Sequence, residues 1–103
     1  MSNTIWKYKL PRDGEVITIE EYIVEPLRVE CQNGVPTLWA VVNPEKKCCL
    51  TEIVAWGTGW DLPDDVYYGC EYFGTCEDEY GFVWHYFAKV HQVNSQTTDT
   101  LTT

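Results

Sequence analysis

Three carboxylates follow a glycine-rich turn in the middle of the chain and form the first candidate site. Gly57 and Gly59 are separated by one residue, and the acidic residues after them are Asp61, Asp64 and Asp65. Glycines let a backbone approach a ligand closely, and carboxylate oxygens bind hard divalent cations. The spacing fits no calcium loop, however, and no lysine follows the glycines as in a phosphate-binding loop. We therefore interpret these residues as turn-forming and helix N-capping, with ligand or ion binding as the alternative.

His85 is a second candidate for acid and base chemistry. It lies in an apolar stretch between Trp84 and Tyr86. A neutral imidazole at this position could act as a general base together with Asp64 or Asp65. No nucleophile is identifiable beside it in the sequence. Because buried polar side chains are hydrogen-bonded, we favour a hydrogen-bonded core histidine and expect no enzymatic activity.

The cysteines raise the question of disulfides or zinc. They are Cys31, Cys48, Cys49, Cys70 and Cys76. Their number is odd and the chain begins without the apolar core of a signal peptide, so we predict reduced thiols in the cytoplasm. Neither the adjacent pair nor the C-x5-C spacing fits a structural zinc knuckle, even with His85 or His91 as a further ligand. We expect neither a metal nor another cofactor.

Aromatic residues cluster around the same glycine-rich turn. They are Trp56, Trp60, Tyr67, Tyr68 and Tyr72. Aromatic side chains belong mostly to cores, but Trp60 falls in a predicted loop and Tyr67 follows the acidic residues closely, so neither has an obvious strand position that would bury it. Exposed aromatics within an acidic rim are typical of protein-binding hot spots and of base-stacking pockets.

The charge distribution indicates the kind of partner. The chain has 16 acidic and 7 basic residues and a net charge of -9, a field that repels phosphate backbones and anionic membranes. We therefore expect no direct nucleic-acid binding and no membrane association. No Lys or Arg occurs from Cys48 to Ala88. The acidic residues of that stretch are Glu52, Asp61, Asp64, Asp65, Glu71, Glu77, Asp78 and Glu79. They form either a solvated face that keeps the protein soluble or a docking surface for a basic partner.

Short strands joined by turns are the elements that must position these residues. Alternating, β-branched or aromatic segments predict strands at 5–10, 16–19, 27–32, 37–42, 50–56, 67–76 and 81–87. We expect the turn at 11–14 to pair the first two as a hairpin, Asn33-Gly34 to close a second hairpin with a type I′ turn, and residues 77–80 to close the last. Apolar residues on both faces of the last segment indicate an interior strand.

The predicted architecture is one antiparallel domain over residues 1–88. Its class is all-β or mostly β, a small sandwich or barrel of about six to seven strands. Residues 89–103 are mostly polar and predict a disordered tail. An exposed hairpin edge would also permit a homodimer.

Four blocks of the sequence carry a resemblance to a known family. The blocks are residues 5–10, 32–42, 57–65 with its Gly-Thr-Gly and Pro-Asp-Asp, and 72–75 together with 83–87. In their order and similar spacing they resemble a family of short uncharacterised proteins of tailed bacteriophages and prophage-bearing bacteria. The resemblance implies a cytoplasmic accessory protein made in an infected bacterium, but no reaction. The adjacent Cys48 and Cys49, the acidic turn at 77–79 and the polar tail depart from the family's usual pattern.

Two functions follow as expectations. The first is a non-enzymatic protein that binds and blocks a host or anti-phage defence protein with a basic surface. Its expected contact residues are Trp60, Asp61, Asp64, Asp65, Tyr67, Glu77, Asp78 and Glu79. The alternative is a protein that sequesters a nucleotide-derived signal in an aromatic, glycine-rich pocket. An anionic ligand of that kind would need Arg12, Arg28, Lys46 or Lys47 to fold over the pocket.

Overall fold

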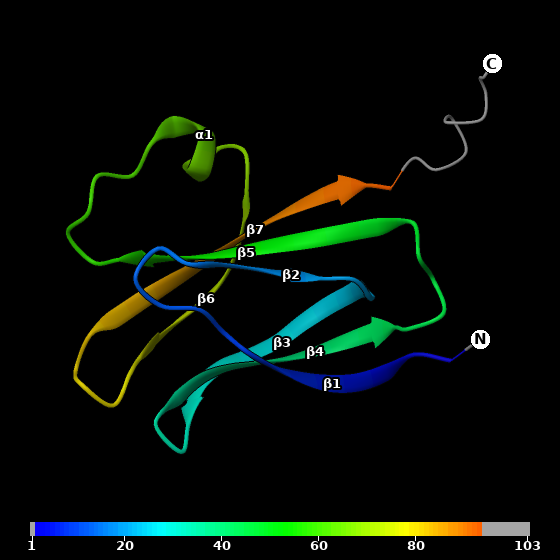
Figure 1. The fold of residues 1–103 in the computed structure, drawn as a ribbon, viewed down its shortest axis with the longest axis horizontal. Coiled ribbons are helices and arrows are strands. Elements are labelled where there is room, and N and C mark those ends of the chain that lie inside the picture. Colours follow the sequence, from blue (N-terminus) through cyan, green and yellow to red (C-terminus); the bar gives the residue numbers. More distant parts are fainter. Residues whose placement is uncertain (1, 94–103) are drawn as a thin grey trace.

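A computed structural model describes residues 2–93 of the chain, while Met1 and residues 94–103 lie outside the described part. The described residues form seven strands and one short helix (Figure 1). In chain order the elements are β1 (Thr4–Lys9), β2 (Val16–Ile19), β3 (Tyr22–Gln32), β4 (Val35–Asn43), β5 (Cys49–Gly57), α1 (Asp64–Tyr67), β6 (Glu71–Glu77) and β7 (Val83–Gln92).

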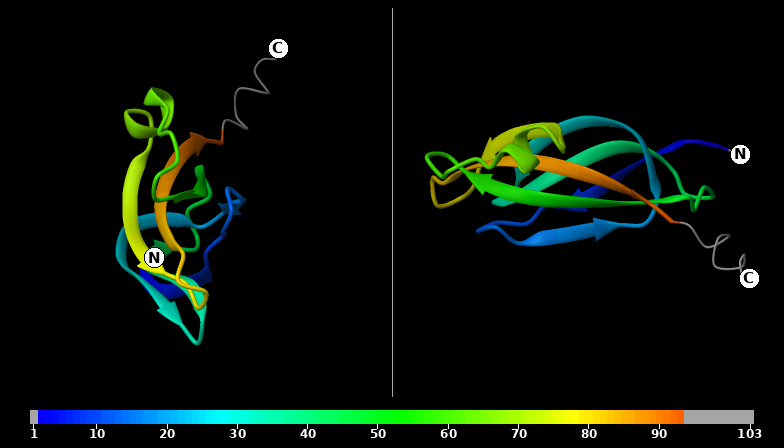
Figure 2. Two further views of the ribbon diagram at one scale, coloured as in Figure 1. Left: turned by 90° about the vertical axis from the view of Figure 1, so that its left-hand side faces the viewer. Right: turned by 90° about the horizontal axis from the view of Figure 1, so that it is seen from above.

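The strands form two antiparallel sheets. The first has the order β1-β4-β3 and the second the order β2-β5-β7-β6. Figure 2 shows the twist of these strands from two further sides. The predicted all-β or mostly β fold, a sandwich or barrel of six to seven strands, is therefore confirmed, and the two sheets make it a sandwich. Strand β7 pairs with β5 on one side and β6 on the other, so the prediction of an interior strand is also confirmed.

The predicted hairpin between the first two strands is wrong. Strand β1 pairs with β4, whereas β2 pairs with β5 in the other sheet. Beyond β1, the Leu10 N–H still donates to the Pro36 carbonyl of β4 at 2.9 Å. Pro11 then brings no N–H for a ladder, and Asp13 and Gly14 both adopt positive φ angles, which turn the chain toward the second sheet. A turn signal in the sequence marks where the chain bends but does not say which sheet it enters.

The other two predicted hairpins are confirmed. Asn33 and Gly34 join β3 to β4 with φ angles of 52° and 81°, the left-handed values that a type I′ turn requires. The turn between β6 and β7 covers residues 78–82, which overlaps the predicted residues 77–80 and extends beyond them to Phe82. Strand β3 contains two register shifts, next to Val24 and Leu27, both of which are exposed.

Two predicted boundaries need correction. Residues 64–67 form the helical turn α1, which no helical period announced, so Tyr67 is not part of a strand. Strand β7 continues to Gln92 because residues 89–92 pair with the start of β5, so the domain extends past residue 88 and the predicted tail starts too early. The rest of that tail, from residue 94, lies outside the described residues.

None of the helices among residues 2–93 has the length and apolar character needed to cross a membrane.

The core lies between the two sheets. Its buried residues are Leu10, Ile19, Leu38, Ala40, Val42, Ile53, Ala55, Trp84, Tyr86 and Ala88. Tyr86 is fully buried, and its hydroxyl donates to the Pro11 carbonyl at 2.8 Å. The core thus fixes the link between β1 and β2 against β7, and with it one end of the sandwich.

Candidate functional site: two pockets beside Trp60

The side chain of Trp60 packs against Gly57 at the end of strand β5. Its backbone N–H donates to the Gly57 carbonyl at 3.2 Å and tightens the loop that follows the strand. The indole ring lies on Gly57, where an added Cβ would stand 2.6 Å from the ring atom Cε2. Trp60 is nevertheless 44% exposed. A large aromatic surface therefore faces solvent from a fixed position.

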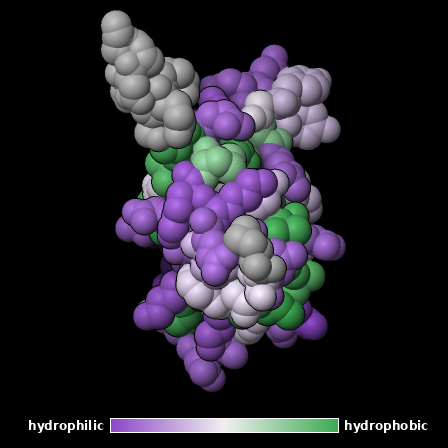
Figure 3. Space-filling view, turned by 90° about the vertical axis from the view of Figure 1, so that its right-hand side faces the viewer, coloured by the Kyte–Doolittle hydropathy of each residue, from purple (hydrophilic) through white to green (hydrophobic). Residues whose placement is uncertain are grey.

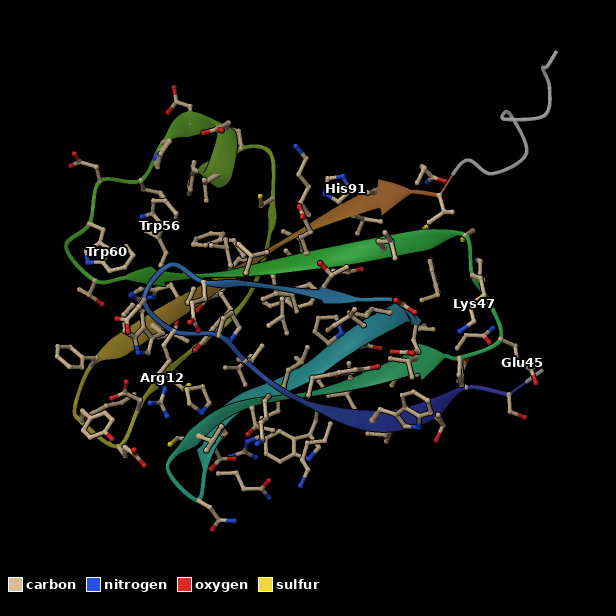
Figure 4. All side chains as sticks on the ribbon, viewed as in Figure 1. Arg12, Glu45, Lys47, Trp56, Trp60 and His91 are labelled. Carbon is tan, nitrogen blue, oxygen red and sulfur yellow. The ribbon has the colours of Figure 1, made fainter. Side chains whose placement is uncertain are left out.

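Two further tryptophans flank this ring and hold it edge-on. Trp56 lies 5.8 Å from Trp60 and Trp84 lies 5.5 Å from it, measured between ring centroids, with interplanar angles of 70° and 79°. Figure 4 shows Trp56 and Trp60 together at one end of the sandwich. The indole of Trp56 donates to the Asp61 carbonyl at 2.8 Å, and that of Trp84 to the Asp78 carboxylate at 2.9 Å. Edge-to-face pairs of this kind stabilise a defined ring geometry.

Two open pockets share the Trp60 ring as a common wall. The end pocket has a volume of about 380 Å³ and is lined by Asp13, Gly57, Thr58, Trp60, Gly81, Phe82, Val83 and Trp84. The face pocket, of about 260 Å³, is lined by Trp56, Gly57, Thr58, Gly59, Trp60, Leu62, His85 and Phe87. Most of these side chains are apolar or aromatic. Residues from three separate loops and two strands thus meet at one exposed tryptophan.

His85 lines the face pocket and is not the core histidine that the sequence suggested. Its side chain is only half-buried, on the outer face of β7. Thr58 Oγ1 lies 2.6 Å from its Nε2 and Thr75 Oγ1 lies 2.9 Å from its Nδ1. The Thr75 hydroxyl in turn contacts the Tyr72 hydroxyl. The ring is hydrogen-bonded as expected, but to two threonine hydroxyls, so the alternative of an acid/base pair with Asp64 or Asp65 is not formed.

The carboxylates of the β5–α1 loop point to solvent. Asp61, Asp64 and Asp65 are all exposed. The predicted capping role is wrong, because Pro63 is the N-cap of α1 and no side chain caps the helix. Asp64 and Asp65 instead occupy its first turn. Asp61 adjoins Trp60 of the face pocket in the chain, whereas Asp65 lines a separate pocket together with Lys89.

Asp78 in the β6–β7 turn is a buried structural residue, which corrects its predicted place on the docking surface. It is 6% exposed, and its carboxylate accepts hydrogen bonds from the Tyr80 and Phe82 backbone N–H groups at 2.9 and 3.0 Å, besides the Trp84 indole. Desolvation raises the pKa of this carboxyl, but the hydrogen bonds from Trp84, Tyr80 and Phe82, together with Arg12, outweigh it and leave the pKa below its ordinary value.

Arg12 ties together three turns at this end of the molecule. Its guanidinium donates to the Gly34 carbonyl at 2.9 Å, lies 3.9 Å from the Asp78 carboxylate, and stands over the Tyr80 ring at 5.7 Å. The Glu79 side chain lies against Gly34 of the β3–β4 turn. Glu77 and Glu79 themselves are exposed, as the sequence predicts. Arg12 is thus committed to fixing the turn that supplies Phe82 to the end pocket.

Tyr67 lies outside the two pockets beside Trp60. It is 57% exposed on α1 and packs edge-on against Tyr68 with ring centroids 4.8 Å apart. It lines neither pocket. Its role as a second anchor of the same binding site therefore stays a prediction.

No Lys or Arg lines either pocket, although Arg12 precedes Asp13 of the end pocket. Arg12 is engaged by Gly34 and Asp78. Arg28 pairs with Glu30 at 2.6 Å, and Lys46 stands over the Tyr22 ring. Lys47 lies at the opposite end of the sandwich (Figure 4), and that end is largely hydrophilic at its centre (Figure 3). The four cations that the signal-binding alternative requires thus have other contacts or positions in this structure.

The cysteines are free thiols spread over the described residues. Cys48 and Cys49 are in contact, with their sulfur atoms 3.3 Å apart. The thiol hydrogen bond with Cys48, followed by burial, raises the pKa of Cys49. Burial raises the pKa of Cys76 to about 11. Within residues 2–93 no three metal-binding side chains come together.

Several residues of the site escaped the sequence analysis. Asp13, Thr58 and Phe82 line the pockets from segments that are far apart in the chain. The Gly-Thr-Gly motif did mark the correct loop, but its first glycine matters as the seat of an indole ring and not as a ligand cradle. The alternation of Phe82 and Trp84 was the one available signal that both would face the same side.

One comparison with known proteins places the chain in a family. The model of a domain of unknown function, DUF7352, matches residues 1–97, so the chain belongs to this family. Neither a curated protein nor a solved structure matches it.

Proposed function

We propose that this DUF7352 protein is a non-enzymatic binding protein that captures a basic partner protein at the two pockets beside Trp60. The observation that carries the proposal is the exposed Trp60 ring, seated on Gly57 and shared by two apolar pockets. Hot spots of protein interfaces are enriched in tryptophan that anchors in such surroundings. Asp13, in the end pocket, and Asp61, next to Trp60, give the site its negative character.

The kind of partner follows from the charges and from the resemblance to phage proteins. An acidic rim attracts a basic protein and speeds its association. We infer that this partner is a host or anti-phage defence protein, and that this chain blocks it by binding in the cytoplasm of an infected bacterium. A homodimer through the edge strand β1, where Ile5 and Trp6 are exposed, remains a separate prediction.

Affinity capture with matched variants tests the proposal. The tagged protein is incubated with bacterial lysate at low and at high salt, beside Trp60→Ala and Trp6→Ala. The two tryptophans are similarly exposed, at 44% and 41%, but Trp6 lies on β1 in the other sheet. We expect a basic protein that is retained at low salt, reduced at high salt, lost with Trp60→Ala and kept with Trp6→Ala. Equal capture by both variants would reject the site.

A further inference from the structure

We infer that the occupant of the two pockets is an extended, proline-rich segment with an adjacent arginine or lysine, bound as a polyproline II helix. The inference rests on the proposed function, since it names the class of segment by which the partner is held. Four features of the site lead to it: the pairing of its strands, the two aromatic-lined pockets on either side of Trp60, the indole N–H of Trp60 and the charge around it.

The strands at the site leave no edge for a peptide to extend the sheet. Strand β5 is paired with β7 as far as Gly57 but with β2 only as far as Val54. Beyond Val54 the Ala55 N–H donates to the Glu15 carbonyl at 3.5 Å, and the Gly57 carbonyl accepts from the Trp60 N–H at 3.2 Å, so the chain's own loops occupy this side of the strand. Strand β7 is paired with β5 and β6. A bound segment therefore cannot add as a further strand there. It must instead lie across side chains and keep its own backbone conformation, as a polyproline II segment does without internal hydrogen bonds.

The two pockets lie on either side of one aromatic ring. Trp60 is a wall of both, with Trp56 lining the face pocket and Trp84 the end pocket. Polyproline II places every third residue on the same side, with a rise of about 9 Å per turn. Aromatic-lined grooves bind proline-rich segments in this conformation, so two prolines one turn apart are the groups that enter the two pockets. Rigid proline rings also lose little conformational entropy on binding.

The polar groups of the site suit a chain that lacks N–H groups. Proline has no backbone N–H, so it enters an apolar pocket without leaving a donor unsatisfied, while its carbonyl still needs a partner. The indole N–H groups of Trp56 and Trp84 already have acceptors. The hydrogen bonds of residues 2–93 include none from Trp60 Nε1, which leaves this group to donate to a carbonyl of the bound segment.

The charge around the pockets selects a basic flank. Asp13 is exposed in the end pocket, Asp61 follows Trp60, and no Lys or Arg lines either pocket. Arg12, the cation closest in sequence to Asp13, is occupied by Gly34 and Asp78. An arginine or lysine next to the prolines therefore meets carboxylates, whereas a phosphate or an acidic flank meets repulsion.

Peptide titration of the full chain tests this inference directly. Three synthetic peptides of equal length are compared: a polyproline with two flanking arginines, the same polyproline with two flanking glutamates, and a glycine-serine peptide with two arginines. Binding is followed by backbone amide chemical shifts, which also locate the bound surface. The variants are Trp60→Ala, Trp60→Phe and, as a control on the other sheet, Trp6→Ala.

We expect the basic polyproline to bind at least about 10-fold more tightly than either other peptide. Only this peptide has both prolines for the apolar pockets and arginines for the carboxylates around them. Shifts should centre on Gly57–Trp60 and on Gly81–Trp84. Trp60→Ala should weaken binding about 10-fold or more. Trp60→Phe should keep part of the affinity, since it retains an aromatic wall but lacks the N–H, and Trp6→Ala should leave binding unchanged.

The outcomes separate this inference from the proposed function. No binding of the basic polyproline, or equal binding of all three peptides, would overturn the inference. If protein capture still depends on Trp60 in that case, the proposed function stands and only the class of segment is wrong. If the Trp60→Ala variant captures the partner protein as well as wild type does, the proposed function itself is rejected, regardless of the peptide results.

Discussion

Asp78 in the β6–β7 turn and Asp61 in the loop after β5 each hold one neighbour of Trp60, but by different groups. Asp78 uses its buried carboxylate to accept from the Trp84 indole, whereas Asp61 uses its backbone carbonyl to accept from Trp56 and leaves its carboxylate exposed. Any residue could supply the carbonyl, but only an acceptor side chain of this length serves at position 78. Two acidic residues of one predicted docking surface thus differ completely in what their side chains do.

The largest expected effect separates these two residues by stability. Asp78→Ala removes the acceptor of the Trp84 indole and of the Tyr80 and Phe82 N–H groups, which are left without their partners. We expect Tm to fall by roughly 10 °C or more in this variant. Asp61→Ala keeps its backbone carbonyl and should change Tm by no more than about 3 °C. Thermal unfolding followed by near-UV circular dichroism measures both, and similar losses would contradict the comparison.

The second-largest effect concerns Gly57, the residue against which the Trp60 ring packs. Gly57→Ala places a Cβ 2.6 Å from the Trp60 ring, which must move and change both pockets. We expect the affinity for the basic polyproline to fall about 10-fold. In a Trp60→Ala background the same glycine substitution should cost almost nothing further, since the ring that it displaces is already gone. Additive losses in this double-mutant cycle would show that Gly57 acts in another way.

The pH dependence of thermal stability should reveal the role of the buried Asp78 carboxylate. The pKa of Asp78 is lowered in the folded state, so its charge contributes stability above the pKa of the unfolded chain and loses that contribution as the pH falls through the folded value. Wild type should therefore lose Tm steeply below about pH 4. In Asp78→Asn this slope should be shallower. The measurement is Tm against pH for the two proteins, and parallel curves would count against the assignment.

The smallest effect concerns the rim alone. Asp61→Asn removes one exposed charge beside Trp60 without touching the apolar pockets. We expect the association rate of a basic ligand to fall about two- to three-fold at low salt, with little change in the dissociation rate. The difference from wild type should vanish at high salt because exposed charges are screened. A change that persists at high salt would mean that Asp61 makes a direct, desolvated contact.

Much of the fold could be predicted because its signals are local. Asn33-Gly34 specifies a type I′ turn by its backbone preferences, and the alternation of apolar residues marks β4 and β7 with their buried faces. The same signals could not place β2, because a four-residue β-branched strand fits the edge of either sheet. Helix α1 was missed since one turn is too short for a helical period.

The candidate site also has features that the sequence predicts and features that depend on the tertiary structure. The sequence by itself determined that Trp60 would lie in a loop among acidic residues, because no strand pattern includes it and no basic residue is near it in the chain. Only the tertiary structure decided that Asp78 is buried, that Tyr67 lines neither pocket, and that Phe82 and Trp84 complete a pocket with Trp60. Those facts depend on which turns meet across the two sheets. Such contacts join residues far apart in the chain, and a single sequence carries no local signal for them.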